Sequence, residues 1–254
     1  MRVEYRCTAD DILWSGMSCS EEDPCPIYLE LNAVESVGNR IFVAGNIHGD
    51  VMTLYSIFLS SDDAGKTWRE VFPRLRGCGL DHIQFVDFES GWVSGQSLFP
   101  LPQDPFLLLT DDGGKTWRNR PVFGESRTGS IQQFWFSSRQ NGKLVIDRGQ
   151  SGESSRYELY ESPNGGETWM IRETSDRPIQ IKGIRTAGSG WRIRADGPSQ
   201  SFLIERQQAD RWNPIASFSV PIGVCKPPEP VPEPQSAAES GLPIRPAAPS
   251  LKKQ

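Results

Sequence analysis

The sequence has little of what several functional classes require. It contains only two histidines and four methionines among 254 residues, and 27 Lys and Arg are outnumbered by 32 Asp and Glu. A general nucleic-acid binder needs a basic surface to displace counterions, so the net charge of −5 argues against a nucleic-acid partner. No apolar run approaches the ~20 residues that cross a bilayer, so we expect no transmembrane segment.

Targeting and redox signals are equally sparse. The opening "MRVEYRCTADDILWSGM" has no continuous apolar stretch, so it is not a clear signal peptide, and the compartment stays open. No two cysteines have the paired CxxC spacing of zinc sites. Disulfides between the two ends of the chain, in particular between Cys225 and an early cysteine, and unpaired structural thiols remain alternatives. An odd count leaves at least one cysteine without an internal partner: Cys7, Cys19, Cys25, Cys78 and Cys225.

Glycine, proline and tryptophan are abundant, with 24, 20 and 8 residues. This mixture favours many short strands, many turns and a few large aromatic side chains in the core. No segment shows a helical period, and "DILWSG" (Asp11–Gly16) is expected to be a strand. The sequence therefore predicts an all-β fold.

One phrase occurs three times, as "SSDDAGKTW", "LTDDGGKTW" and "ESPNGGETW". The shared pattern is [S/T]-x-[D/N]-x-G-x-T-W, and successive tryptophans lie 49 and 52 positions apart. Such a period indicates a propeller or another repeat array. The residues in the pattern are Ser61, Asp63, Gly65, Thr67 and Trp68; Thr110, Asp112, Gly114, Thr116 and Trp117; and Ser162, Asn164, Gly166, Thr168 and Trp169.

Each phrase follows a short β-rich landmark: "FVAG", "WVSG" and "LVID". A fourth landmark, "WRIR", precedes Trp212, where only the tryptophan of the pattern survives. The second unit contains four strand-like segments in about fifty residues, including the apolar run "PFLLLT". The sequence thus predicts a small β-propeller of about four four-stranded blades.

The repeated phrase has a physical explanation as a turn between the last two strands of a blade. Its glycine permits positive φ, and its Asp or Asn accepts hydrogen bonds from turn amides that have no strand partner. The tryptophan then leaves the turn and fills the gap between blades. We therefore expect these residues to be structural rather than catalytic, metal-binding or cofactor-binding.

The three phrases resemble the Asp-box, or bacterial neuraminidase repeat, over roughly residues 27–220. Families with this motif include sialidases, other glycoside hydrolases, sortilin-type receptors and photosystem II assembly factors. "GWVSG" beside "DDGGKTW" is most similar to the photosystem II assembly factors. In these families the motif is a peripheral turn away from the ligand, so the resemblance implies a structural role. Together with the cysteine placement, it also suggests an extracytoplasmic location.

No catalytic group emerges from the sequence. The Arg-Ile-Pro element of sialidases is absent, although arginines such as Arg74, Arg76, Arg185, Arg192 and Arg194 are numerous. No spacing selects a pair of glycosidase carboxylates from Asp81, Asp87, Glu89 and Asp147. Neither His48 nor His82 stands beside a nucleophile signature.

The domain plan is an N-terminal segment (1–26) that offers a closing strand, a propeller (27–222), and a Pro-rich disordered tail (223–254). We expect a non-enzymatic scaffold that binds protein, without a cofactor. A sialidase-like glycoside hydrolase or a carbohydrate-binding propeller is the alternative. The binding surface is expected on strand-connecting loops, for which the candidates are Ser97–Phe106 and Arg120–Arg127.

Overall fold

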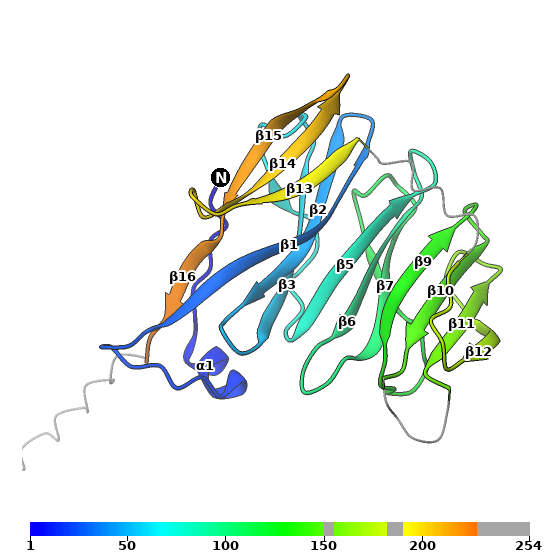
Figure 1. Ribbon diagram of the computed structural model, residues 1–254, viewed down its shortest axis with the longest axis horizontal. Helices are drawn as coiled ribbons and strands as arrows, with labels where there is room; N and C mark the ends of the chain where they lie inside the picture. Colours follow the sequence, from blue (N-terminus) through cyan, green and yellow to red (C-terminus); the bar gives the residue numbers. More distant parts are fainter. Residues whose placement is uncertain (150–154, 182–189, 228–254) are drawn as a thin grey trace, which may run out of the picture.

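The computed structural model describes residues 1–149, 155–181 and 190–227 and contains four antiparallel sheets (Figure 1). The first sheet comprises β16 (Pro221–Cys225), β1 (Cys25–Val37), β2 (Arg40–His48), β3 (Thr53–Ser61) and β4 (Arg69–Glu70). The second comprises β5 (Cys78–Phe85), β6 (Gly91–Ser97), β7 (Gln103–Thr110) and β8 (Arg118–Pro121). The third comprises β9 (Ser130–Phe136), β10 (Gly142–Asp147), β11 (Tyr157–Ser162) and β12 (Met170–Ser175). The fourth comprises β13 (Trp191–Asp196), β14 (Ser201–Gln208) and β15 (Arg211–Ser219).

These sheets confirm the predicted all-β fold of blade-like units. Each sheet is a meander in which consecutive strands pair, as in a propeller blade. The apolar run of β7 is buried from Phe106 to Leu109, as expected for a strand covered on both faces. The fourth sheet has three strands among the described residues, and the first gains a fifth from the end of the chain.

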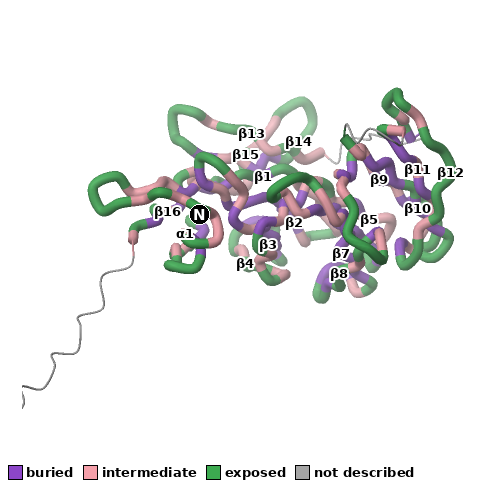
Figure 2. The backbone as a smooth tube through the Cα atoms, turned by 90° about the horizontal axis from the view of Figure 1, so that it is seen from below, coloured by how far each residue is buried: buried purple, intermediate pink, exposed green. Residues whose placement is uncertain are grey.

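The sheets stand side by side along an arc, in the order fourth, first, second, third (Figure 1). Buried residues, purple in Figure 2, form clusters that join neighbouring sheets. One cluster joins Phe58 of the first sheet to Leu108 of the second, and another joins Leu107 of the second to Phe134 of the third. A third cluster joins Leu29 of the first sheet to Ile204 of the fourth. The core is therefore a series of seams rather than one central mass.

The segment Asp11–Gly16 is not a strand, contrary to the sequence-based expectation. It belongs to helix α1 (Ala9–Ser15), which ends at Gly16 with φ of 66°. A capping box explains the difference, because the Thr8 side chain accepts from the Asp11 amide while the Asp11 side chain accepts from the Thr8 amide. This local start signal outweighs the β-like composition. Helix α1 has seven residues, and no helix among the described residues is long and apolar enough to cross a membrane.

The strand that closes the first sheet comes from the end of the chain rather than its start. β16 pairs with the beginning of β1, so it crosses the boundary at residue 223 expected between propeller and tail. The N-terminus instead lies along the fourth sheet, where the Met1 ammonium donates to the Ser217 carbonyl at 2.5 Å. The predicted tail lies outside the described residues from 228 onward.

Two disulfides fasten this region. Cys7 is bonded to Cys225, which is the expected link between an early cysteine and the last one, and Cys19 is bonded to Cys25. Cys78 is free. Two disulfides are consistent with an extracytoplasmic location.

Loss of the Cys7–Cys225 bond should destabilise the protein strongly, because it closes a loop of 218 residues in the unfolded chain. We expect Cys7→Ser to lower the free energy of unfolding by about 2–5 kcal/mol. Urea titration measures this, with Cys78→Ser as a matched control that should change little. Peptide mapping without reductant provides the direct check. Five thiols that are all alkylated without reduction would contradict the assignment.

Candidate functional site

The first repeated turn, between β3 and β4, satisfies its polar groups internally. The Ser61 hydroxyl donates to Asp63 Oδ1 at 2.8 Å and accepts from the Gly65 amide at 2.7 Å. Asp63 also accepts from the Thr67 amide at 2.8 Å and from the Thr67 hydroxyl at 2.7 Å. Both carboxylate oxygens are therefore engaged within the turn, which leaves little capacity to bind a ligand.

The second and third turns repeat this pattern of bonds. Asp112 accepts from the amide and hydroxyl of Thr116 at 3.0 and 2.7 Å. Asn164 accepts from the Thr168 amide at 3.0 Å and donates from Nδ2 to the Thr168 hydroxyl at 2.9 Å. Thr110 and Ser162 accept from the amides of Gly114 and Gly166, both at 2.8 Å.

The tryptophan of each turn packs against another aromatic ring. Trp117 lies edge-on to Phe58 of the first sheet, with ring centroids 4.9 Å apart. Trp68 lies edge-on to Phe218 of the fourth sheet at 5.3 Å. Trp169 lies edge-on to Phe136 of its own sheet at 6.0 Å and joins the cluster that spans the second and third sheets. These indoles occupy seams between sheets.

The turn glycines meet two requirements at once. Gly65 and Gly114 have φ of 94° and 81°, which side chains disfavour. A Cβ on Gly65 would meet Ile215 of the fourth sheet, and one on Gly114 would meet Phe42 of the first. Glycine is therefore required twice, by the positive φ of the turn and by the close approach of the turn to the adjacent sheet.

A second set of polar residues lies on the first strands of the sheets. β1, β5 and β9 each have a bulge at the same level, which leaves Asn32, Asp81 and Gln132 without a direct partner on the next strand. Asp81 accepts from Gln96 Nε2 at 2.6 Å. Burial raises the pKa of Asp81, partly opposed by that hydrogen bond, and Glu30 adds to the increase.

The other sequence candidates are mostly paired or inaccessible. Arg139 binds Asp87 and Glu89, both at 2.6 Å. Ion pairs of this kind join Arg74 to Glu70, Arg76 to Asp10, Arg156 to Asp147, and Arg192 and Arg194 to Glu205; Arg185 lies outside the described residues.

Neither histidine is near an accessible nucleophile in the described part of the chain. His82 Nδ1 is 3.4 Å from the hydroxyl of Ser94, which is fully buried. His48 stacks loosely on Tyr28. Burial raises the pKa of the free Cys78 thiol to about 11, so little of it is thiolate at neutral pH. Among residues 1–149, 155–181 and 190–227, no group of three His, Cys, Asp or Glu is arranged to hold a metal.

The two loop candidates come together at one edge of the arc. The Asp104 carboxylate accepts from the Arg127 amide at 2.9 Å and from the Ser126 hydroxyl at 3.0 Å, so the stretch Ser97–Phe106 is joined to Arg120–Arg127. Helix α1 lies at the same edge, the lower one in Figure 1, and its Trp14 meets Phe99 edge-on at 5.9 Å.

This edge carries much of the exposed apolar surface. Leu13 of α1 is 82% exposed, Val51 of the β2–β3 loop is 87% exposed, and Leu101 of the β6–β7 loop is 60% exposed. We call α1, the β2–β3 loop and the two joined loops the lower-edge surface. Exposed apolar side chains gathered at one edge are a feature of interaction surfaces.

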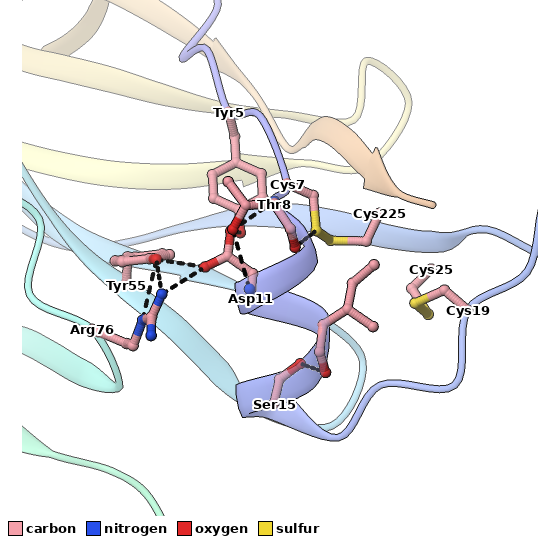
Figure 3. Close-up of a disulfide and its surroundings, with 11 residues drawn as sticks. Tyr5, Cys7, Thr8, Asp11, Ser15, Cys19, Cys25, Tyr55, Arg76 and Cys225 are labelled. Carbon is pink, nitrogen blue, oxygen red and sulfur yellow. Dashed lines mark hydrogen bonds and ion pairs between the residues drawn. A yellow bond between two sulfur atoms is a disulfide. The ribbon is translucent and has the colours of Figure 1, made fainter. Parts of the chain in front are cut away.

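Sequence reasoning missed the contacts that hold α1 in place (Figure 3). Asp11 is buried and accepts from the Tyr55 hydroxyl at 2.5 Å. Arg76 pairs with Asp10 at 2.6 Å and covers the ring of Trp14 at 5.5 Å. The capping pattern Thr8-x-x-Asp11 was the available signal for the helix; its partners Tyr55 and Arg76 are distant in sequence and carry no such signal.

Comparisons with known proteins do not show a family for this chain. No family model matches the sequence. The curated relative is an oligoxyloglucan-reducing end-specific xyloglucanase from Emericella nidulans, 27% identical over 119 residues, which cover 45% of this chain and 14% of the relative.

Solved structures with a similar arrangement include YCF48 bound to a D1 peptide, with a TM-score of 0.43 and 15% identity over 77% of this chain and 60% of that one. The GH74 xyloglucanase from Xanthomonas campestris has a TM-score of 0.40 and 18% identity over 69% of this chain and 26% of that one. The chain covers less than two thirds of the length of each of these relatives.

The turn aspartates should make stability depend on acid pH. Hydrogen bonds from Thr67 lower the pKa of Asp63 to about 2. At Asp112, burial raises the pKa of the carboxyl, but hydrogen bonds from Thr116 outweigh burial and lower the pKa to about 2 as well. Such groups stabilise the fold above their unfolded pKa, and this stability is lost as pH falls through the folded pKa. We expect unfolding free energy to decline between pH 3.8 and about 2.

Two reciprocal variants isolate this effect. Asp112→Asn should flatten the decline, whereas Asn164→Asp should steepen it by adding a third titrating turn. Urea titrations at several pH values in this range measure both. If the two variants follow the wild-type profile, the turn carboxylates do not control the acid transition.

Proposed function

We propose that this protein is a non-catalytic scaffold of propeller blades that binds another protein through its lower-edge surface. The observation that carries the proposal is the exposure of Leu13, Val51 and Leu101 at one edge, on helix α1 and two loops that the sheets hold in place. Apolar side chains on a rigid framework bind a partner with little loss of conformational entropy. The motif residues are expected to serve the architecture and leave this edge free for binding.

The location of the binding loops follows from the meander. The turns with the repeated phrase follow β3, β7 and β11, whereas the loops of the lower-edge surface follow β2 and β6. Because consecutive strands run in opposite directions, these two sets of connections emerge at opposite edges. Variation in the lower-edge loops can therefore alter binding without disturbing the turns.

A tagged full-length chain, isolated from its native cell, should bring down a defined protein partner. In the double variant Val51→Asp with Leu101→Asp, the amount of partner recovered should fall at least about tenfold, because two charges would be placed in an apolar contact. Phe88→Asp is a matched control, since Phe88 is 76% exposed on the β5–β6 loop at the opposite edge. Retention by the double variant, or loss with Phe88→Asp, would contradict the proposal.

Action on a glycan is the second candidate, and the bulged residues favour it. Glu30 and Asp81 lie on the neighbouring first strands β1 and β5, and the pKa of Asp81 is raised, as a proton donor in a glycosidase requires. The paired state of Arg74, Arg192 and Arg194 speaks against a sialidase-like clamp for a substrate carboxylate.

We expect no release of sugar from xyloglucan oligosaccharides, chromogenic glycosides or sialosides above a buffer blank. Turnover that disappears in Asp81→Asn and persists in Asp87→Asn would contradict the scaffold proposal and indicate a glycosidase. Asp87 is a suitable control because its carboxylate is already held by Arg139.

A further inference from the structure

A pocket opens between the second and third sheets, and no feature of the proposed scaffold accounts for it. It has a volume of about 450 Å³, within the range of small-molecule sites. Three connections line it: Leu101 and Pro102 before β7, Thr128 to Ser130 at the start of β9, and Asp147 to Gly149 at the end of β10.

Arg148 is the unusual member of this lining. Its side chain is only 10% exposed, and its buried Nε and Nη1 atoms have no hydrogen-bond partner among the residues that the structure describes. The carboxylate of Glu158 is 3.8 Å from Nε, beyond hydrogen-bond range, and its nearer oxygen accepts from the Tyr160 hydroxyl at 2.6 Å. Guanidinium donors buried in this way cost free energy unless an acceptor arrives.

The repeat shows that the fold does not require an arginine here. Ile41, Gly91 and Gly142 each pair with the first residue of a turn motif, which aligns β2, β6 and β10. Counting along these strands places Ile47, Ser97 and Arg148 at equivalent positions. Ile47 is fully buried, so an apolar side chain serves the first sheet at this point. The third sheet instead has a cation at this point, beside the buried carboxylate of Glu158.

The charges around Arg148 favour a ligand with one negative charge. Asp147, also in the lining, is neutralised by Arg156, whose Nε and Nη2 bind it at 3.0 and 2.9 Å. Glu158, 3.8 Å from Arg148 Nε, repels any ligand anion and so limits the negative charge that the pocket accepts. The Ser130 hydroxyl accepts from Gln132 at 3.1 Å and retains its own proton for a ligand oxygen.

We propose that this pocket binds the carboxylate group of a small ligand through Arg148, supported by the hydroxyls of Ser130 and Thr128. A ligand carboxylate would accept a charge-assisted hydrogen bond from Nε or Nη1 of Arg148, one of the two donors that lack a hydrogen-bond partner among the described residues. The carboxylate can come from a sugar acid or from a peptide C-terminus. This inference goes beyond the scaffold function and does not depend on a protein partner.

Calorimetric titration at constant ionic strength, with sodium glucuronate and N-acetyl-dialanine as probes, tests the proposal. At least one of them should bind, and its uncharged amide should not. Arg148→Gln should weaken that binding about tenfold or more, the effect expected for a charged hydrogen bond. Arg127→Gln is the matched control, because Arg127 covers the same Phe123 ring at 5.0 Å but does not line the pocket.

The two probes distinguish the sources, since tighter glucuronate binding indicates a sugar acid and tighter dipeptide binding a chain terminus. The melting temperature gives a second readout: the bound probe should raise it for the wild type and for Arg127→Gln, but not for Arg148→Gln. Absence of binding by both probes, equal binding of the amides, or wild-type affinity in a folded Arg148→Gln would overturn the proposal.

Discussion

The contact between a turn indole and the adjacent sheet is the interaction on which the arc depends. Trp117 meets Phe42 and Phe58 edge-on, with centroids 5.8 and 4.9 Å apart, and an aromatic contact of this geometry adds about 0.5–1.5 kcal/mol to ordinary burial. The indole can take this direction because the preceding turn is fixed by the bonds of Asp112 and Thr116. The hydrogen bonds within the turn and the aromatic packing between the sheets thus depend on each other. The same device at Trp68 joins the first sheet to the fourth.

The internal hydrogen bonds of the turns leave the motif carboxylates little capacity to bind a ligand. The carboxylates of Asp63 and Asp112 are partly exposed, but their oxygens accept hydrogen bonds from their own turns. Outside the turns, Asp87 is held by Arg139 in the same manner. Buried donors that lack a hydrogen-bond partner carry more information about binding, because leaving them unsatisfied costs free energy. Arg148 has two such donors, and it directly follows β10 at a position where the first sheet has Ile47.

The repeat made the sheets predictable from sequence, since its period, its turn residues and its alternating apolar runs all indicate the same unit. The turn hydrogen bonds were also foreseeable, because Asp and Thr at fixed spacing have few other partners. Helix α1 was not, since a seven-residue helix is too short to show a period and depends on Thr8 and Asp11 for its start. The pocket at Arg148 could not be found either. Its lining comes from three connections, and the lack of an acceptor for a guanidinium is visible only once the neighbouring side chains are placed.

The N-terminal segment and β16 meet on one side of the arc. β16 and the Cys7–Cys225 bond hold the first sheet, while the N-terminus lies along the fourth. The joint between the first and fourth sheets is thus reinforced by backbone pairing and a covalent bond. The joint between the second and third sheets has the packing of Trp92 on Phe136, 3.7 Å apart, and the two bonds of the Gln84 amide with the Phe136 backbone, each 2.8 Å. Because side chains rather than a disulfide hold the second and third sheets together, substitutions in the loops at this joint do not break a covalent link. It is at this joint that the pocket opens, beside the apolar loop of Leu101, so a ligand there would meet both the cation and the lower-edge surface.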